Sequence, residues 1–189
     1  MAQLIEIDTD RLRLRQWCPA DREPFAMLNS DPGVMEFFPG LLSRAESDAL
    51  ADRCQALISE RGWGFWAVTP RDTGEFIGFV GLHIPTDTLP FSPCVEVGWR
   101  LAAKYWGKGY ATEAARAALG VGFERLALAE IVSFTCLGNI RSRAVMQRLG
   151  MHDTGTTFAH PNIPVGNALR EHCLYKITRE QWRTNNVTV

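Results

Sequence analysis

The alternation of apolar and polar residues along the chain predicts seven strands. Residues 11–15 (RLRLR) and 95–101 (VEVGWRL) alternate with a period of two, which is typical of a strand with one apolar face. The turn sequence Asp72-Thr73-Gly74 separates two further apolar runs, so that these runs predict a hairpin. The predicted strands cover residues 11–15, 63–69, 76–83, 95–101, 130–136, 151–158 and 170–177.

Four helices are predicted between these strands. Ser43 and Glu46 form a Ser-x-x-Glu capping box, which opens a helix that runs to about residue 61. Asn139 is a favourable N-cap for a later helix. The predicted helices cover residues 19–29, 43–61, 112–126 and 139–149. This order of elements indicates an α/β or α+β protein with helices packed on a sheet.

Length and charge narrow the range of functions. A chain of 189 residues is the size of one domain, which we expect to cover residues 1–189. Lys plus Arg (20) nearly balance Asp plus Glu (21), which disfavours nucleic acid or an anionic membrane as partner. The chain contains no apolar run of about 18 residues, and residues 1–10 lack the pattern of a secretory signal.

The cysteines and histidines predict neither disulfides nor a metal site. The five cysteines are far apart and include no C-x-x-C pair, which is typical of reduced thiols in a cytoplasmic protein. The four histidines lack metal-ligand spacing. We therefore expect a cytoplasmic protein without a metal.

Residues 106–112 (WGKGYAT) carry the strongest chemical signal, since they follow a predicted strand and open a predicted helix. Two glycines permit a tight turn whose N–H groups, together with the helix dipole, suit a pyrophosphate. From spacing alone, a glycine-rich turn without a ligand is an equal alternative. Thr112 occupies the third glycine position of G-x-G-x-x-G, and no G-x-x-x-x-G-K-S/T is present. A dinucleotide oxidoreductase or a mononucleotide kinase is therefore disfavoured.

The stretch 95–151 resembles the core of the GNAT superfamily of acetyl-CoA-dependent N-acetyltransferases. Residues 106–111 are similar to its phosphate-binding signature Arg/Gln-x-x-Gly-x-Gly/Ala, except that Trp106 replaces the Arg or Gln. Asn139-x-x-Ser142, followed by Leu-Gly-Met at 149–151, is similar to the next family motif.

Further similarity extends from about residue 9 to about residue 183. The RLRLR strand and the closing strand at 174–177 look like the RimJ/RimL branch, which includes ribosomal-protein N-terminal acetyltransferases. The resemblance implies the GNAT fold, with a mixed, largely antiparallel sheet of about seven strands and about four flanking helices. Its sheet is expected to splay between strands 4 and 5, which are residues 95–101 and 130–136.

The resemblance also implies that acetyl-CoA binds in this splay as co-substrate. Main-chain groups of the strand at 99–101 would contact the pantetheine arm, and the glycine turn would hold the diphosphate. The implied acetyl-CoA-binding residues are Trp99, Arg100, Leu101, Trp106, Gly107, Lys108, Gly109, Tyr110, Ala111, Thr112, Asn139 and Ser142.

Acetyl transfer to an amine requires a proton acceptor, because only the unprotonated amine attacks. Glu96 is the candidate general base, since the family often uses a Glu in this strand. An ion-pair partner or a half-exposed strand residue is the alternative role for Glu96. Met146 occupies the position where many relatives place a Tyr that protonates the departing thiolate. By analogy with the RimL-like branch, Ser142 takes this role.

The acceptor site is expected to include Glu36, Phe38, Trp66 and His172, although core packing is the ordinary role of such aromatic residues. The implied function is acetylation of a primary amine by direct attack. The acceptor is a peptide N-terminus or, as the alternative, a small-molecule amine. A non-catalytic acyl-CoA-binding protein is the second alternative, because Met146 removes the common acid. The sequence leaves a monomer and a homodimer equally open.

Overall fold

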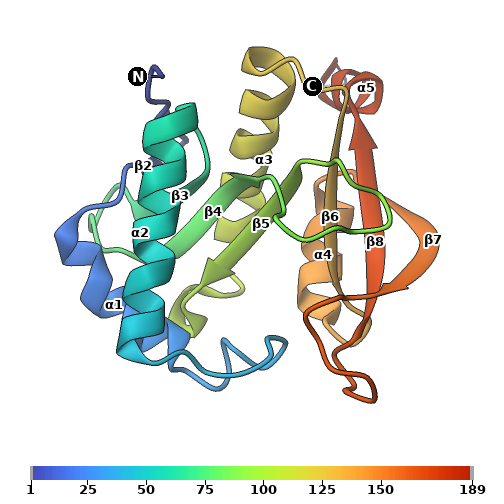
Figure 1. Cartoon of the computed structure of the whole chain (residues 1–189). Coiled ribbons are helices and arrows are strands. Elements are labelled where there is room, and N and C mark those ends of the chain that lie inside the picture. The colour runs from blue at the N-terminus through green and yellow to red at the C-terminus, as the bar shows by residue number, and fades with distance from the viewer. Residues whose placement is uncertain (1, 188–189) are drawn as a thin grey trace.

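The strands form one mixed sheet in which the order is β1-β2-β3-β4-β5-β6-β8-β7 (Figure 1). This computed structural model describes residues 2–187. The eight strands of that range are β1 (Ile7–Asp8), β2 (Leu12–Arg15), β3 (Phe65–Pro70), β4 (Gly78–His83), β5 (Glu96–Leu101), β6 (Glu130–Cys136), β7 (His152–Ala159) and β8 (Glu171–Thr178). All seven predicted strands are present, and the short β1 is an addition at the sheet edge.

Helices cover both faces of the sheet (Figure 1). In that view α2 lies in front of β3 and β4 with α1 beside it, whereas α3 and α4 lie behind the sheet. The helices of the described range are α1 (Arg22–Asn29), α2 (Arg44–Arg61), α3 (Tyr110–Gly120), α4 (Ile140–Arg148) and α5 (Arg179–Val187). The four predicted helices are confirmed, and α5 follows β8 as a fifth. None of the helices in residues 2–187 is long and apolar enough to cross a membrane.

The caps of two helices agree with the sequence prediction. The Ser43 hydroxyl accepts a hydrogen bond from the Glu46 N–H, while the Glu46 carboxylate accepts one from the Ser43 N–H at 2.7 Å. Asn139 Oδ1 accepts a bond from the Ser142 N–H at 3.1 Å. Each cap satisfies N–H groups that the first helical turn leaves without a partner.

Helix α3 departs from its predicted range at both ends. It begins at Tyr110 rather than at Thr112, because Gly109 adopts a left-handed φ of 81° and starts the helix there. After Gly120 the chain continues as one π-helical turn over Val121–Arg125. A Cβ atom on Gly122 would lie 2.5 Å from a methyl carbon of Ile131, so this turn packs directly on β6.

The sheet divides between β5 and β6. β4 and β5 pair over six residues each, and β6 and β8 pair over seven. The parallel pair β5–β6, by contrast, has a single registered position, Glu96 opposite Val132. The two strands diverge beyond this point, which confirms the predicted splay.

Candidate active site

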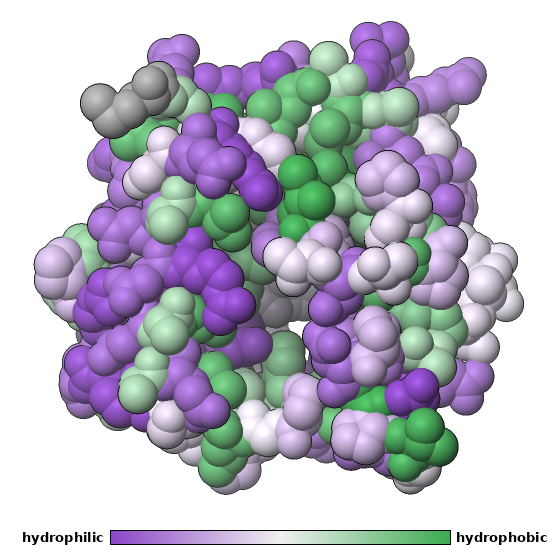
Figure 2. Space-filling model, viewed as in Figure 1, coloured by the Kyte–Doolittle hydropathy of each residue, from purple (hydrophilic) through white to green (hydrophobic). Residues whose placement is uncertain are grey.

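A cleft of about 1840 Å³ occupies the region where β5 and β6 diverge. Figure 2 shows the hollow between the two halves of the molecule. One wall comes from β5, the turn after it and the start of α3, and the other from β6, α4 and β8. Charged side chains at the α3 and α4 end of the lining include Arg116, Arg141 and Arg148. This excess of cations suits a phosphorylated ligand.

The β6-facing edge of β5 presents free main-chain groups to the cleft. The Val95 carbonyl accepts the Val132 N–H at 2.9 Å, so it points toward β6. Peptide groups alternate between the two edges of a strand, and those of Trp99 and Leu101 therefore face the same gap. The Leu101 carbonyl already accepts the Trp106 indole N–H there. The peptide groups of Arg100 face β4, where Arg100 pairs with Phe79. The main-chain groups left free toward the gap are those of Trp99 and the Leu101 N–H, whereas Arg100, for which main-chain contact with a pantetheine arm was predicted, directs its main chain to β4.

The glycine turn provides a backbone cradle at the start of α3. Gly107 and Gly109 have φ values of 74° and 81°, which are conformations that favour glycine. A Cβ atom built on Gly107 would meet nothing within 4 Å, so the turn is open on that side. The cleft lining includes Gly107, Gly109 and the first helical residues Tyr110, Ala111 and Thr112. Lys108 is exposed and does not line the cleft. These features fit a diphosphate held by N–H groups and the helix dipole.

Arg11 holds the glycine turn in place, a role that sequence reasoning missed. Its guanidinium donates to the Lys108 carbonyl at 3.0 Å and to the Glu113 carboxylate at 2.6 Å. The same group lies 4.9 Å from the centre of the Tyr110 ring. The only sequence signal at Arg11 is a polar position in an alternating strand, which does not reveal a contact 97 residues away.

Trp106 stabilises the end of β5 rather than supplying a charge. Its indole N–H donates to the Leu101 carbonyl at 2.7 Å. The Arg141 guanidinium lies 4.6 Å from the Trp106 ring centre and pairs with Glu36 at 2.6 Å. Glu36 is therefore placed at the rim, beside a residue of the cleft lining, and not within the lining itself.

Asn139, Ser142 and Met146 lie together on the α4 side of the cleft. The Asn139 side-chain amide donates to the Thr135 hydroxyl at 3.0 Å while its oxygen caps α4. The Met146 side chain is buried, which leaves Ser142 as a half-exposed hydroxyl on this wall.

Glu96 lies at the narrow end of the cleft, beside the single β5–β6 bridge. Its carboxyl group makes no hydrogen bond or ion pair with any residue of the described range. Burial raises the pKa of Glu96 to about 8, and the nearby charge of Asp87 adds to this effect. A carboxyl with this pKa accepts a proton near neutral pH, as a general base for an amine must.

Of the residues predicted for the acceptor site, Phe38 and His172 line the cleft and Trp66 does not. Trp66 is fully buried, and its indole N–H donates to the Ile5 carbonyl at 2.7 Å. The neighbouring Phe65 takes the cleft position, because successive side chains of β3 point to opposite faces. His172 is mostly buried on β8, and this burial lowers the pKa of its imidazole.

Comparisons with known proteins show the family of the chain. Residues 11–152 match the family model of the acetyltransferase (GNAT) domain. The chain is 33% identical to the FsC-acetyl coenzyme A-N(2)-transacetylase of Aspergillus fumigatus over 183 residues, which is 93% of this chain and 77% of that protein. It is 31% identical to the N-acetyltransferase YnaD of Bacillus subtilis over 94% of this chain and 99% of that one.

Solved structures show the same architecture. The crystal structure of a GNAT-family acetyltransferase from Bacillus anthracis superposes with a TM-score of 0.78 at 26% identity, covering 93% of this chain and 99% of that chain. Together with the family match, these relatives show that the chain is an acyltransferase. The chain belongs to the GNAT acetyltransferase family.

Proposed function

We propose that this protein transfers the acetyl group of acetyl-CoA to a primary amine, with Glu96 as the general base. The observation that carries the proposal is the position of Glu96, a carboxyl without a partner, beside the free β5 edge in a cleft that ends in a phosphate cradle. Along β5 and the turn after it lie, in order, the proton acceptor, the path of the thioester and the site for the diphosphate.

The reaction would proceed by direct attack. Glu96 takes a proton from the ammonium group, and the freed nitrogen forms a C–N bond with the thioester carbonyl carbon. A main-chain N–H of the β5 edge donates to the developing oxyanion, an interaction worth ~3 kcal/mol in other enzymes. The nitrogen of the intermediate then releases its second proton to solvent as the C–S bond breaks to give the amide. The thiolate takes a proton from the Ser142 hydroxyl, which is restored from solvent.

Two acceptors are candidates. One is a small-molecule amine, and the relative named as an N(2)-transacetylase, which aligns over 93% of this chain, supports acetyl transfer to a nitrogen. A peptide N-terminus, as in the RimJ/RimL branch, rests on weaker support. That support is a match at 28% identity over 58% of this chain to the Bacillus subtilis protein YdaF, which is named for ribosomal acetylation.

A comparison of Glu96→Gln with the wild type tests the proposal. Release of the CoA thiol is followed with a panel of small primary amines and short N-terminal peptides. We expect the variant to lose ~10²–10⁴-fold in kcat, with acetyl-CoA affinity by calorimetry nearly unchanged. The wild-type rate should rise with pH up to about 8, where Glu96 loses its proton, and this rise should be absent in the variant.

Glu130→Gln is the matched control, because Glu130 undergoes the same chemical change outside the cleft, in an ion pair with Lys176. Its rate and pH profile should equal those of the wild type. An unchanged pH profile in Glu96→Gln would rule out this base. Acetyl-CoA binding without thiol release on any amine would instead favour the non-catalytic acyl-CoA-binding protein.

A further inference from the structure

Arg100 presents a cation without an acidic partner in the acceptor part of the cleft. Its Nη1 donates to Asn29 Oδ1 at 2.6 Å, while its Nε is buried and has no hydrogen-bond partner. Among residues 2–187 it forms no ion pair, and burial lowers its pKa to about 10. An amide oxygen carries no net charge, so Asn29 does not neutralise the guanidinium. A buried charge in this condition is costly unless something else compensates it.

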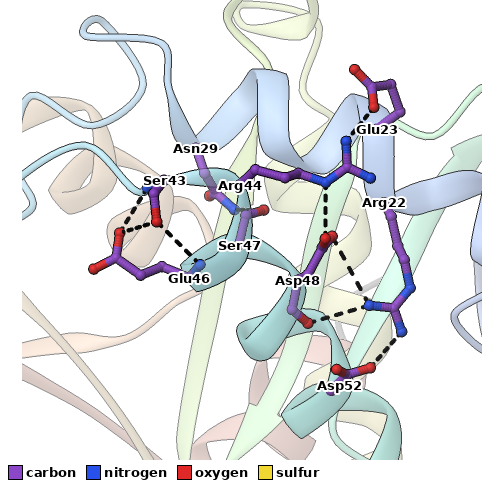
Figure 3. A network of polar contacts seen from close by, with 9 residues as sticks. All are labelled: Arg22, Glu23, Asn29, Ser43, Arg44, Glu46, Ser47, Asp48 and Asp52. Atoms are coloured by element: carbon purple, nitrogen blue, oxygen red, sulfur yellow. Dashed lines mark hydrogen bonds and ion pairs between the residues drawn. The ribbon is translucent and has the colours of Figure 1, made fainter.

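The surroundings of Arg100 hold its guanidinium in one position. The Phe38 ring centre lies 4.0 Å from the guanidinium carbon, and the Phe79 ring centre lies 5.4 Å from it. Asn29 is itself held by Ser47, whose hydroxyl accepts the Asn29 amide N–H at 2.9 Å. Figure 3 shows Asn29 and Ser47 within the network of polar contacts that joins α1 to α2. The two rings and Asn29 fix the guanidinium, and its Nη2 has no hydrogen-bond partner among residues 2–187.

The same face of β5 carries Glu96, Gly98 and Arg100 in alternate positions. Gly98 has no side chain between the other two, and a Cβ atom there would lie 3.2 Å from the Phe65 ring. Four residues of strand place the Glu96 and Arg100 Cα atoms ~13 Å apart. The Phe65 ring therefore packs on Gly98 and forms the cleft surface between a proton acceptor at one end and a cation at the other.

We propose that Arg100 binds a carboxylate of the acceptor while the acceptor amine lies at Glu96. The acceptor class is then an amine that carries a carboxylate several bonds away, with a slender or flat body that lies against the Phe65 ring. A simple α-amino acid is too short to reach both ends. This inference rests on the proposed acetyl transfer and specifies its substrate class.

Three pairs of acceptors test the proposal: glycine and glycinamide, 6-aminohexanoate and 6-aminohexanamide, and 4-(aminomethyl)benzoate and 4-(aminomethyl)benzamide. Each pair differs only in the carboxylate. For the two longer pairs we expect the wild type to prefer the carboxylate by at least ~10-fold in kcat/KM, which corresponds to ~1.4 kcal/mol. In the glycine pair this preference should be absent.

Arg100→Met should bring the ratio for the longer pairs close to one, whereas Arg100→Lys should keep part of the preference. Loss of packing alone would lower both members of a pair equally and leave the ratio unchanged. Acetyl-CoA affinity by calorimetry should stay the same in both variants. A wild-type ratio near one, or an unaltered ratio in Arg100→Met, would overturn the inference. A comparable loss of acetyl-CoA affinity in Arg100→Met would also overturn it, because Arg100 would then bind the coenzyme.

A binding measurement separates this inference from the proposed acetyl transfer. Calorimetric titration of the wild type, saturated with CoA, compares 4-(aminomethyl)benzoate with its amide. Tighter binding of the carboxylate, lost in Arg100→Met, would support the anion site even if no amine is acetylated. Equal binding of the two compounds would refute the anion site, although acetyl transfer to other amines could still stand.

Discussion

At the scale of single residues, the half-buried carboxyl of Glu96 makes the stability of the protein depend on pH. Its pKa of about 8 in the folded protein exceeds the ordinary value of 4.5. The folded chain therefore keeps a proton that the unfolded chain has released between these two values. The free energy of unfolding consequently falls as the pH rises through this interval, by up to ~1.4 kcal/mol per pH unit from this group.

Glu96→Gln should remove this contribution. The melting temperature of the variant should exceed that of the wild type at pH 8.5, and the difference should shrink toward pH 4.5. Thermal unfolding followed by circular dichroism at both pH values measures this difference. Glu130→Gln, which is exposed, should follow the wild type. Parallel melting curves for Glu96→Gln and the wild type at all pH values would contradict the burial of a proton-holding carboxyl.

The residue scale also shows how far sequence patterns determine a site. Asn139 is a favourable cap in the sequence, and it caps α4 in the structure, because this preference depends on local backbone geometry. Trp66 and Phe65 differ by one position on a strand, and composition alone does not say which faces the cleft. Arg11 reaches the glycine turn through tertiary contacts, which no local pattern encodes.

At the scale of elements, the turn before α3 depends on its two left-handed glycines. Gly109→Val should abolish acetyl-CoA binding, because a β-branched residue resists φ near 81° and its side chain would enter the cradle. Calorimetry with acetyl-CoA measures the loss, which we expect to be at least ~100-fold in Kd, or ~2.7 kcal/mol.

Gly74→Val is the matched control for this loss. Gly74 lies in the turn between β3 and β4, away from the cleft, and has a φ of 68° with no atom within 4 Å of its Cβ position. It therefore suffers similar backbone strain, and its acetyl-CoA binding should stay at the wild-type level. Undiminished binding by a folded Gly109→Val protein would count against the cradle.

Element boundaries were predictable where a local signal defines them. The Ser43 box starts α2 as predicted, because both of its hydrogen bonds form within four residues. The start of α3 shifted to Tyr110, since Gly109 takes a left-handed conformation that the amino-acid letters do not report. The insertion of β8 between β6 and β7 is equally invisible, because strand order depends on contacts remote in sequence.

At the scale of the whole molecule, the cleft exists because two halves of a sheet meet at one bridge. The splay was inferable only through resemblance to a family, since periodicity identifies strands but not their separation. The composition established a chain of one domain's size with balanced charge, and the family match over residues 11–152 established the chemistry. The acceptor is the part of the function that the fold leaves open, because its pocket is built from loops and single side chains.

The free edge of β5 provides a test at this scale. Addition of acetyl-CoA should slow hydrogen exchange of the Trp99 and Leu101 amides, which face the gap between the halves. The amides of Gly98 and Arg100, already directed toward β4, should change less. Exchange rates followed by NMR with and without acetyl-CoA measure both pairs. Equal rates for Trp99 in the two states would exclude an arm lying along this edge.

The elevated pKa of Glu96 has a consequence for the enzyme in the absence of an acceptor. With Glu96 as the proposed base, a carboxyl that is still protonated at neutral pH would activate water poorly, and a bound thioester would be spared hydrolysis while no acceptor is present. An incoming ammonium ion favours the ionised form of the same carboxyl through its positive charge. Binding of the acceptor would thus ionise the carboxyl that then removes its proton.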